Sequence, residues 1–203
     1  MDNLKKYFYY YLGQIYLPNS IKNKDNLLLH ISDTPTCIYG AINNLIKELK
    51  PKYIVHTGDV ADNIKLEFHP KFINRYEKSI KKLVHILENS SAEKIYIAMG
   101  NHDNKSILQK HIKKSTLLTK EKFLIENIKF YISHFPKDIK ISPSQINMFG
   151  HNLSIKTKED NGKLYLNGLL NIHIYDLDTK EVTYLLYPYG TDYSRLKKGK
   201  TGI

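Results

Sequence analysis

Hydrophobic positions in the first half of the chain follow two alternating spacings. Short, continuous apolar runs, typical of strands buried on both faces, occupy residues 27–31, 53–55 and 95–99. Between these runs, apolar side chains recur every three or four residues over 38–49 and 70–89, which is the period of a helix with one buried face. The alternation of strand and helix predicts βαβ units and a mostly parallel sheet.

The second half has a different pattern, in which short apolar runs are separated by turn residues. We expect strands at 128–132, 146–149, 164–166, 169–175 and 182–187. The pairs Asn161-Gly162 and Asn167-Gly168 are typical of hairpin turns. This half is therefore predicted to be a strand-rich, largely antiparallel layer. The looser pattern over 104–126 is interpreted as one or two helices.

The two ends of the chain differ from the rest. Residues 1–17 contain an aromatic run that predicts a short helix or an edge strand whose rings cap the core; binding to a membrane surface or a partner is the less favoured interpretation. This stretch is short and is interrupted by Gly13, so we expect no signal peptide and a cytoplasmic protein. We predict one domain over 1–194 and a basic, disordered tail over 195–203.

Composition and charge limit the classes of ligand and partner that we expect. The 203 residues are 41% hydrophobic and 25% charged, as in an ordinary soluble globular protein. The formal charge of +11 favours an anionic partner, although a lysine-rich solvated surface explains it equally well. We expect a phosphate-bearing small molecule or a nucleotide; nucleic acid stays open, although the lysines are scattered rather than grouped. With no apolar run long enough to span a bilayer, we expect no membrane partner. The sequence does not indicate an oligomeric state.

Residue types that ligate metals follow five of the predicted strands. The five placements are Asp33, Asp59 with Asp62, Asn101 with His102 and Asp103, His134, and His151. A single Asp after a strand usually caps the next helix, and a single His is usually a hydrogen-bonded structural residue. Turn chemistry alone does not explain five such placements in order. Carboxylate, amide and imidazole groups together suit divalent ions such as Mn²⁺, Fe²⁺ and Zn²⁺.

The order of these segments resembles the calcineurin-like metallophosphoesterase family. The resemblance covers residues 27–153 and rests on Asp33, Gly58-Asp59-Val60-Ala61-Asp62, Gly100-Asn101-His102-Asp103, His134 and Gly150-His151. It implies an α/β fold: a four-layer αββα sandwich with two mixed β-sheets flanked by helices. It also implies one or two divalent metal ions (Mn, Fe, Zn or Ni) and hydrolysis of a phosphomonoester or phosphodiester by metal-activated water.

The resemblance further implies a role for each residue. Asp59 would bridge two metals, Asp33 would bind the first metal, and the second metal would be completed by Asn101, His134 and His151. His102 would be the catalytic histidine, and Asp62 would orient its ring. Asp103 is interpreted as a local hydrogen-bonding residue.

The chain departs from the family pattern at two histidines. The family's Asp-x-His motif reads Asp33-Thr34-Pro35 here, and its Gly-His-x-His motif reads Gly150-His151-Asn152-Leu153. Proline and leucine side chains cannot ligate a metal, and the resemblance assigns both lost histidines to the first metal. The set implied for the second metal is intact.

Three consequences of this loss stay open. The protein works with one tightly held metal, or another histidine substitutes, with His173 the first candidate and His56 and His30 behind it. Alternatively, catalysis is impaired and the fold serves as a metal-binding module in a protein- or nucleic-acid-binding subunit. The presence of both His102 and Asp62 favours an enzyme, because a binding scaffold needs no oriented acid.

Overall fold

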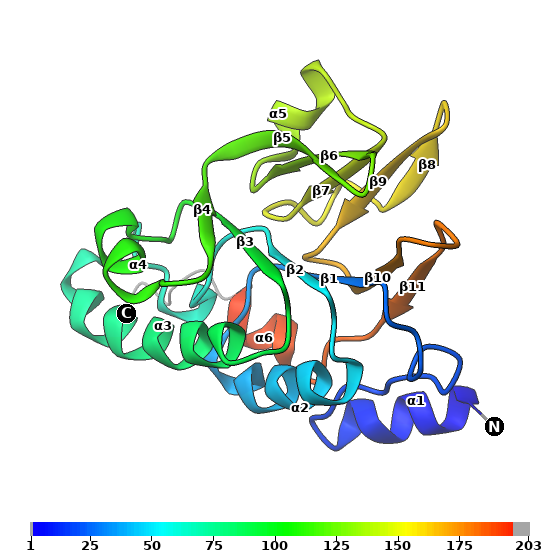
Figure 1. The fold of residues 1–203 in the computed structure, drawn as a ribbon. Helices are drawn as coiled ribbons and strands as arrows, with labels where there is room; N and C mark the ends of the chain where they lie inside the picture. Colours follow the sequence, from blue (N-terminus) through cyan, green and yellow to red (C-terminus); the bar gives the residue numbers. More distant parts are fainter. Residues whose placement is uncertain (1, 197–203) are drawn as a thin grey trace.

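The computed structural model describes residues 2–196 as four layers, with two β-sheets packed face to face between helices (Figure 1). Helices α1 (Asp2–Tyr11), α2 (Tyr39–Leu49) and α3 (Ile73–Glu88) lie on the outer side of the first sheet. Helix α5 (Pro136–Ile141) lies on the outer side of the second sheet. This arrangement confirms the expected αββα sandwich with two mixed sheets.

The first sheet has six strands in the order β11-β10-β1-β2-β3-β4. Their bounds are β1 (Leu27–Ile31), β2 (Tyr53–His56), β3 (Lys94–Ala98), β4 (Thr116–Leu118), β10 (Ile172–Asp176) and β11 (Val182–Leu185). Strands β1 to β4 are parallel, and β10 and β11 extend the sheet in antiparallel pairing. The predicted βαβ units are confirmed, because α2 and α3 connect these parallel strands, each preceded by a short 3-10 turn, η1 (Thr36–Ile38) and η3 (Pro70–Phe72).

The second sheet has five strands in the order β5-β6-β7-β9-β8. Their bounds are β5 (Lys120–Ile125), β6 (Ile128–Ser133), β7 (Ile146–Phe149), β8 (Lys158–Asp160) and β9 (Lys163–Asn167). The three inner strands β6, β7 and β9 are parallel, and only the two outer strands pair antiparallel. The expectation of one largely antiparallel layer over 128–187 was wrong in two respects. The strands β6, β7 and β9 are parallel, because α5 carries the chain from β6 back to β7, and the strands predicted at 169–175 and 182–187 belong to the first sheet as the antiparallel β10 and β11.

The two predicted hairpin turns have different outcomes. Asn161-Gly162 joins β8 to β9 with both residues in the left-handed region, φ 51° and 69°, as a tight hairpin requires. Asn167-Gly168 instead carries the chain from β9 in the second sheet to β10 in the first. There the Asn167 side chain donates to the carbonyl oxygens of Asn152 and Ile155, both at 2.7 Å. This dipeptide was wrongly interpreted as a hairpin.

The helical prediction over 104–126 was correct only for its first part. Helix α4 (Lys105–His111) is followed by the edge strands β4 and β5. Glu126 and Asn127 both adopt left-handed conformations, φ 47° and 64°, and form a two-residue turn that pairs β5 with β6. Because most side chains of β5 are exposed, the segment lacks the apolar alternation that would have indicated a strand.

Alternate residues of β1 supply two different cores. Leu27, Leu29 and Ile31 pack toward the helices, whereas Leu28 packs between the two sheets. All four are fully buried, and burying such a side chain contributes roughly 1.5–3 kcal/mol. A third, smaller cluster lies between the second sheet and α5. These three cores fix the sheets so that their strand ends meet at one edge.

Both ends of the described chain differ from expectation. The aromatic side chains of α1 do not cap the core, because Tyr7, Phe8 and Tyr11 are 55%, 61% and 68% exposed. Arg195, where the predicted tail begins, is a buried residue at the end of helix α6 (Thr191–Arg195) and stacks on the Tyr187 ring. Residues 197–203 of that tail lie outside the described part. Among the described residues, no helix has the length and hydrophobicity needed to cross a bilayer.

Candidate metal centre

Every candidate segment lies just beyond the carboxyl end of a strand, as the sequence predicted. Asp33, Asp59 and Asn101 follow β1, β2 and β3 of the first sheet, whereas His134 and His151 follow β6 and β7 of the second. Because the two sheets pack face to face, these strand ends can meet at one edge, where α/β folds bind ligands.

Three candidate ligands have an uncommon backbone conformation. Asp33, Asp59 and His151 have φ values of 48°, 56° and 67°, in the left-handed region that residues with a side chain rarely adopt. Such conformations occur where the surrounding structure holds them, often at functional sites. Gly58 makes a close approach possible, because a Cβ there would lie 2.7 Å from both the Gly100 nitrogen and His134 Nδ1. The backbone is therefore shaped around these side chains.

The other three residues implied for the second metal converge on His134 Nε2. The Asn101 Oδ1 atom lies 3.1 Å from this nitrogen, His151 Nδ1 lies 3.2 Å away, and Asp59 Oδ2 lies 3.4 Å away. The other ring nitrogen, His134 Nδ1, donates to the Thr57 carbonyl oxygen over 2.7 Å. That bond directs Nε2 toward the other three ligand atoms, as backbone carbonyls commonly do for metal-binding histidines. This donor set fits a transition metal ion.

Asp59 and His134 each stabilise the charged form of the other. Burial opposes a charge on His134, but the Asp59 carboxylate outweighs burial and raises the pKa of His134 to about 10. For Asp59, burial is likewise outweighed by His134 and His102, which lower the pKa of Asp59 below its usual value.

Asp103 holds the two loops of the site together. Its carboxylate accepts hydrogen bonds from the backbone nitrogens of Asp59, Val60 and Gly100 at 2.8, 3.0 and 2.9 Å. It also accepts from the Tyr76 hydroxyl at 3.0 Å. Burial raises the pKa of Asp103 to about 6. The interpretation of Asp103 as a local hydrogen-bonding residue is confirmed.

The candidate catalytic pair lies next to this cluster. His102 is only 5% exposed, and its backbone nitrogen donates to Asp59 Oδ1 over 2.9 Å. The His102 Nε2 atom is 4.0 Å from Asp62 Oδ1, which is too long for a hydrogen bond, and Lys65 Nζ lies 2.6 Å from that same oxygen. Burial lowers the pKa of His102, whereas burial and the Asp59 carboxylate raise the pKa of Asp62 to about 8.

A glutamate that the sequence did not single out completes the site. The Glu67 carboxylate accepts a hydrogen bond from Asn101 Nδ2 over 2.6 Å and lies 3.6 Å from His102 Nδ1. It is therefore the carboxylate nearest to the His102 ring. Glu67 lies in an irregular connection between 3-10 turn η2 (Asp62–Ile64) and η3, so no strand end or motif indicated it.

The positions assigned to the first metal hold fewer side chains that can ligate a metal. Ser32 Oγ donates to Asp33 Oδ2 over 2.5 Å, and the His151 backbone nitrogen lies 3.3 Å from the same oxygen. Pro35 is buried and leads into η1, and Leu153 is 39% exposed. Asp33 still belongs to a group with Asp59 and His134 whose ligand atoms lie within 4.8 Å of one another; a second such group joins Asp59, Asp62 and His102.

The three histidines considered as substitute ligands, His173, His56 and His30, pair with other residues. His173 Nδ1 lies 3.1 Å from His30 Nδ1, the two rings are stacked, and the other nitrogen of His30 pairs with Thr57 Oγ1 at 3.0 Å. His56 accepts from the Gly58 nitrogen and pairs with Thr34 Oγ1. Neither group of metal-ligating side chains found among the described residues includes any of the three.

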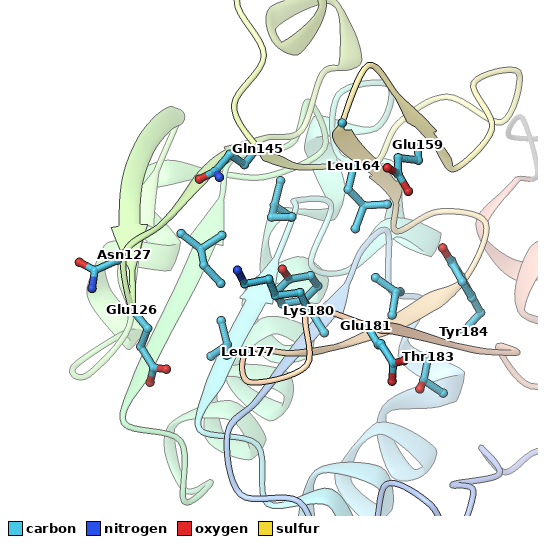
Figure 2. A pocket seen from close by; sticks show the side chains of 15 residues that line it. Glu126, Asn127, Gln145, Glu159, Leu164, Leu177, Lys180, Glu181, Thr183 and Tyr184 are labelled. Carbon is cyan, nitrogen blue, oxygen red and sulfur yellow. The ribbon is translucent and has the colours of Figure 1, made fainter.

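A cavity of about 810 Å³ lies away from this centre, at the opposite ends of the second sheet's strands (Figure 2). Its walls include Ile128 and Ile146, the first residues of β6 and β7, and charged residues such as Glu126 and Lys180 surround it. None of the candidate site residues lines it. The metal-ligating chemistry therefore belongs to the strand ends and not to this cavity.

Comparison with known families decides the relationship. The family of calcineurin-like phosphoesterases matches residues 27–194 of the sequence. The chain belongs to the calcineurin-like phosphoesterase family. Membership in this phosphoesterase family supports a metal-dependent hydrolase that acts on phosphoester bonds. No functionally curated protein matches the sequence significantly.

Solved structures of phosphoesterases share the fold. An archaeal phosphodiesterase is 21% identical with a TM-score of 0.55, and the match covers 79% of this chain and 99% of that one. Yfce, a phosphoesterase from E. coli, is 13% identical with a TM-score of 0.55, and the match covers 79% and 98%. At these identities the likeness establishes the shared sandwich, whereas the chemistry has to be argued from the side chains.

Proposed function

We propose that this calcineurin-like phosphoesterase hydrolyses a phosphomonoester or phosphodiester with one firmly held divalent metal ion. The observation that carries the proposal is the convergence of Asp59, Asn101 and His151 on His134 Nε2, with His102 alongside. Four ligand atoms of suitable chemistry at one point, next to a buried histidine, are what this reaction requires.

The four converging residues would hold the metal. A divalent ion there would supply Lewis-acid charge at the phosphoryl oxygens and lower the pKa of water so that hydroxide is available near neutral pH. Mn, Fe, Zn and Ni all accept this mixture of oxygen and nitrogen ligands. Asp33 would bind a second ion only weakly, because Pro35 and Leu153 stand where two further ligands were expected. His173 is a poor substitute, since it pairs with His30.

His102 would act on the leaving oxygen. Hydroxide bonds to phosphorus through its oxygen, the bond between phosphorus and the leaving oxygen breaks, and protonated His102 transfers its proton to that oxygen. Glu67, at 3.6 Å, would help to orient the ring, and Asp62 would do so once the 4.0 Å gap between it and His102 closes to hydrogen-bond distance. Because burial lowers the pKa of His102, its protonated form is less populated at a given pH than that of a solvent-exposed histidine.

A phosphate-bearing small molecule or nucleotide is the substrate class that we favour. The formal charge of +11 supports an anionic ligand, although it does not distinguish among nucleotides and nucleic-acid ends. We also propose a cytoplasmic location, because the chain's single cysteine, Cys37, is exposed and free, as is usual in a reducing compartment.

The test is hydrolysis of bis-p-nitrophenyl phosphate and p-nitrophenyl phosphate before and after removal of metal. We expect activity in at least one assay, its loss with EDTA, and its return when Mn²⁺ is added to the dialysed protein. Equal cleavage in EDTA would contradict the proposed mechanism.

One observation favours a second function, that of a catalytically impaired metal-binding module in a larger assembly. The aromatic side chains of α1 form an exposed surface, and exposed apolar surfaces of this kind often contact partners. The two functions differ in what His102 does. If the protein is only a module, replacing His102 changes neither metal binding nor partner binding, and the unchanged protein shows no turnover with any phosphoester.

A further inference from the structure

An exposed phenylalanine lies directly beside the candidate catalytic histidine. The Phe68 side chain is 62% exposed and belongs to none of the apolar clusters among the described residues. Its ring centre is 5.3 Å from that of His102, with an angle of 63° between the ring planes. The edge-to-face contact with His102 leaves most of the Phe68 ring open to solvent, and an open aromatic surface beside a reacting group can bind a ligand.

The backbone around Phe68 is held in place. The nitrogens of Phe68 and His69 both donate to the Lys65 carbonyl oxygen over 3.0 Å, which closes a tight turn. Leu66 is 7% exposed and anchors the turn in the core. The fixed backbone and the ring contact with His102 place the Phe68 ring beside the site, which reduces the ordering needed when a ligand binds.

The same turn contacts three residues of the site. Lys65 pairs with Asp62, Glu67 accepts a hydrogen bond from Asn101, and Phe68 contacts His102. The segment 65–68 is therefore built into the site as a wall on the His102 side. A group attached to an oxygen at His102 would lie within reach of the Phe68 ring, whose centre is 5.3 Å from that of His102.

We propose that Phe68 binds the leaving group of the substrate, and that this leaving group carries a planar aromatic ring. This inference rests on the proposed function, because it places the leaving oxygen at His102. When water oxygen bonds to phosphorus and the phosphorus–oxygen bond breaks, the departing alcohol keeps its oxygen and takes the proton from His102. An aryl alcohol or a nucleoside would stack on Phe68, whereas a short alkyl alcohol would gain much less.

Binding of non-hydrolysable phosphonates tests this directly. Benzylphosphonate and n-butylphosphonate carry the same charged group but differ in the aromatic ring. We would measure the affinity of both for the full chain loaded with Mn²⁺ by calorimetry. The unchanged protein should bind the benzyl compound more tightly. Phe68→Ala should lower the affinity for the benzyl compound about tenfold and change the affinity for the butyl compound less than about twofold. Phe68→Tyr should retain the preference.

A matched control exists on α1. Phe8 is 61% exposed, almost the same as Phe68, but lies on the helix α1 outside the site, so Phe8→Ala should leave both affinities unchanged. The inference is overturned if the unchanged protein shows no preference for the benzyl compound. It is also overturned if Phe68→Ala, with an unchanged thermal midpoint of unfolding, lowers the affinity for both compounds equally or for neither.

Hydrolysis assays then show whether the aromatic ring belongs to an aryl alcohol or to a nucleoside. Release of phosphate from 1-naphthyl phosphate and from a nucleoside 5′-monophosphate would be compared in the unchanged protein and in Phe68→Ala. The ester whose KM rises about tenfold is the one whose ring stacks on Phe68. If the unchanged protein hydrolyses neither these monoesters nor bis-p-nitrophenyl phosphate, the proposed function fails, while the phosphonate preference still decides whether Phe68 binds an aromatic ring.

Discussion

Asn101 donates a hydrogen bond from its side-chain amide to the Glu67 carboxylate over 2.6 Å. The amide oxygen of the same side chain lies 3.1 Å from His134 Nε2. Glu67 therefore fixes which end of the amide faces the metal-ligating atoms. Carboxylates and carbonyls behind a ligand commonly orient it in this way and alter metal affinity when removed.

Replacing Glu67 should weaken the metal site without removing a ligand. In Glu67→Ala the Asn101 amide loses its partner and can rotate, so Mn²⁺ affinity measured by calorimetry should fall by about 10-fold or more. Glu67→Gln keeps a carbonyl acceptor and should recover part of the loss. Glu121→Gln on the exposed side of β5 is the control and should bind like the unchanged protein. Equal Mn²⁺ affinities in Glu67→Ala and the control would show that Glu67 is not needed to orient the Asn101 amide.

His102 should be separable from metal binding. His102→Ala removes the proposed proton donor but none of the four converging ligands, so the metal content should stay the same while kcat falls by about 10²–10⁴-fold. The measurement is turnover of whichever p-nitrophenyl ester the unchanged protein cleaves, with metal analysis of the same sample. A variant that retains full kcat would exclude His102 as the acid.

Metal binding should release a proton from His134. Without metal, the Asp59 carboxylate outweighs burial and raises the pKa of His134 to about 10, so this ring is protonated at pH 8. Because a metal binds only the unprotonated nitrogen, binding at pH 8 must displace about one proton. Between pH 7 and 9 the apparent affinity should therefore rise about tenfold per pH unit.

Calorimetry in buffers of different ionisation enthalpy measures this proton directly. The observed enthalpy should change with buffer in the unchanged protein. No dependence on the buffer at pH 8 would mean that His134 is already neutral, or that it does not bind the metal.

Two glycines should respond in opposite directions to alanine. A Cβ at Gly100 would collide with the Asp59 side chain and backbone nitrogen, so Gly100→Ala should lower the free energy of unfolding by about 1–3 kcal/mol. Gly40 lies in α2 with no atom within 4 Å of an added Cβ, so Gly40→Ala should raise the free energy of unfolding by about 0.5–1 kcal/mol. Urea denaturation measures both. Gly100→Ala that is as stable as the unchanged protein would contradict the tight packing at Asp59.

The ligand residues were predictable because their signal is local. His134 and His151 each follow a short apolar strand, so the sequence itself places them at strand ends. The face-to-face sheets then bring them together, which the family resemblance implied and the hydrophobic pattern did not.

Other features depend on contacts that no local pattern encodes. Glu67 reaches Asn101 across 34 positions of sequence from an irregular loop. Strand β5 is an exposed edge, so its pairing with β6 and not its own pattern makes it a strand. Asn167-Gly168 resembles a hairpin turn in sequence, but the backbone carbonyls that Asn167 contacts direct the chain to the other sheet.

The most direct measurement is the number of metal ions that the purified protein holds after dialysis against a trace of Mn²⁺. One firmly bound ion per chain is expected, and His134→Ala should lose it because all the other ligand atoms converge on His134 Nε2. His85→Gln, which changes an exposed histidine on α3, should keep it. Two equally tight ions would contradict the weak first site, and no ion, or an ion retained in His134→Ala, would contradict the metal centre itself.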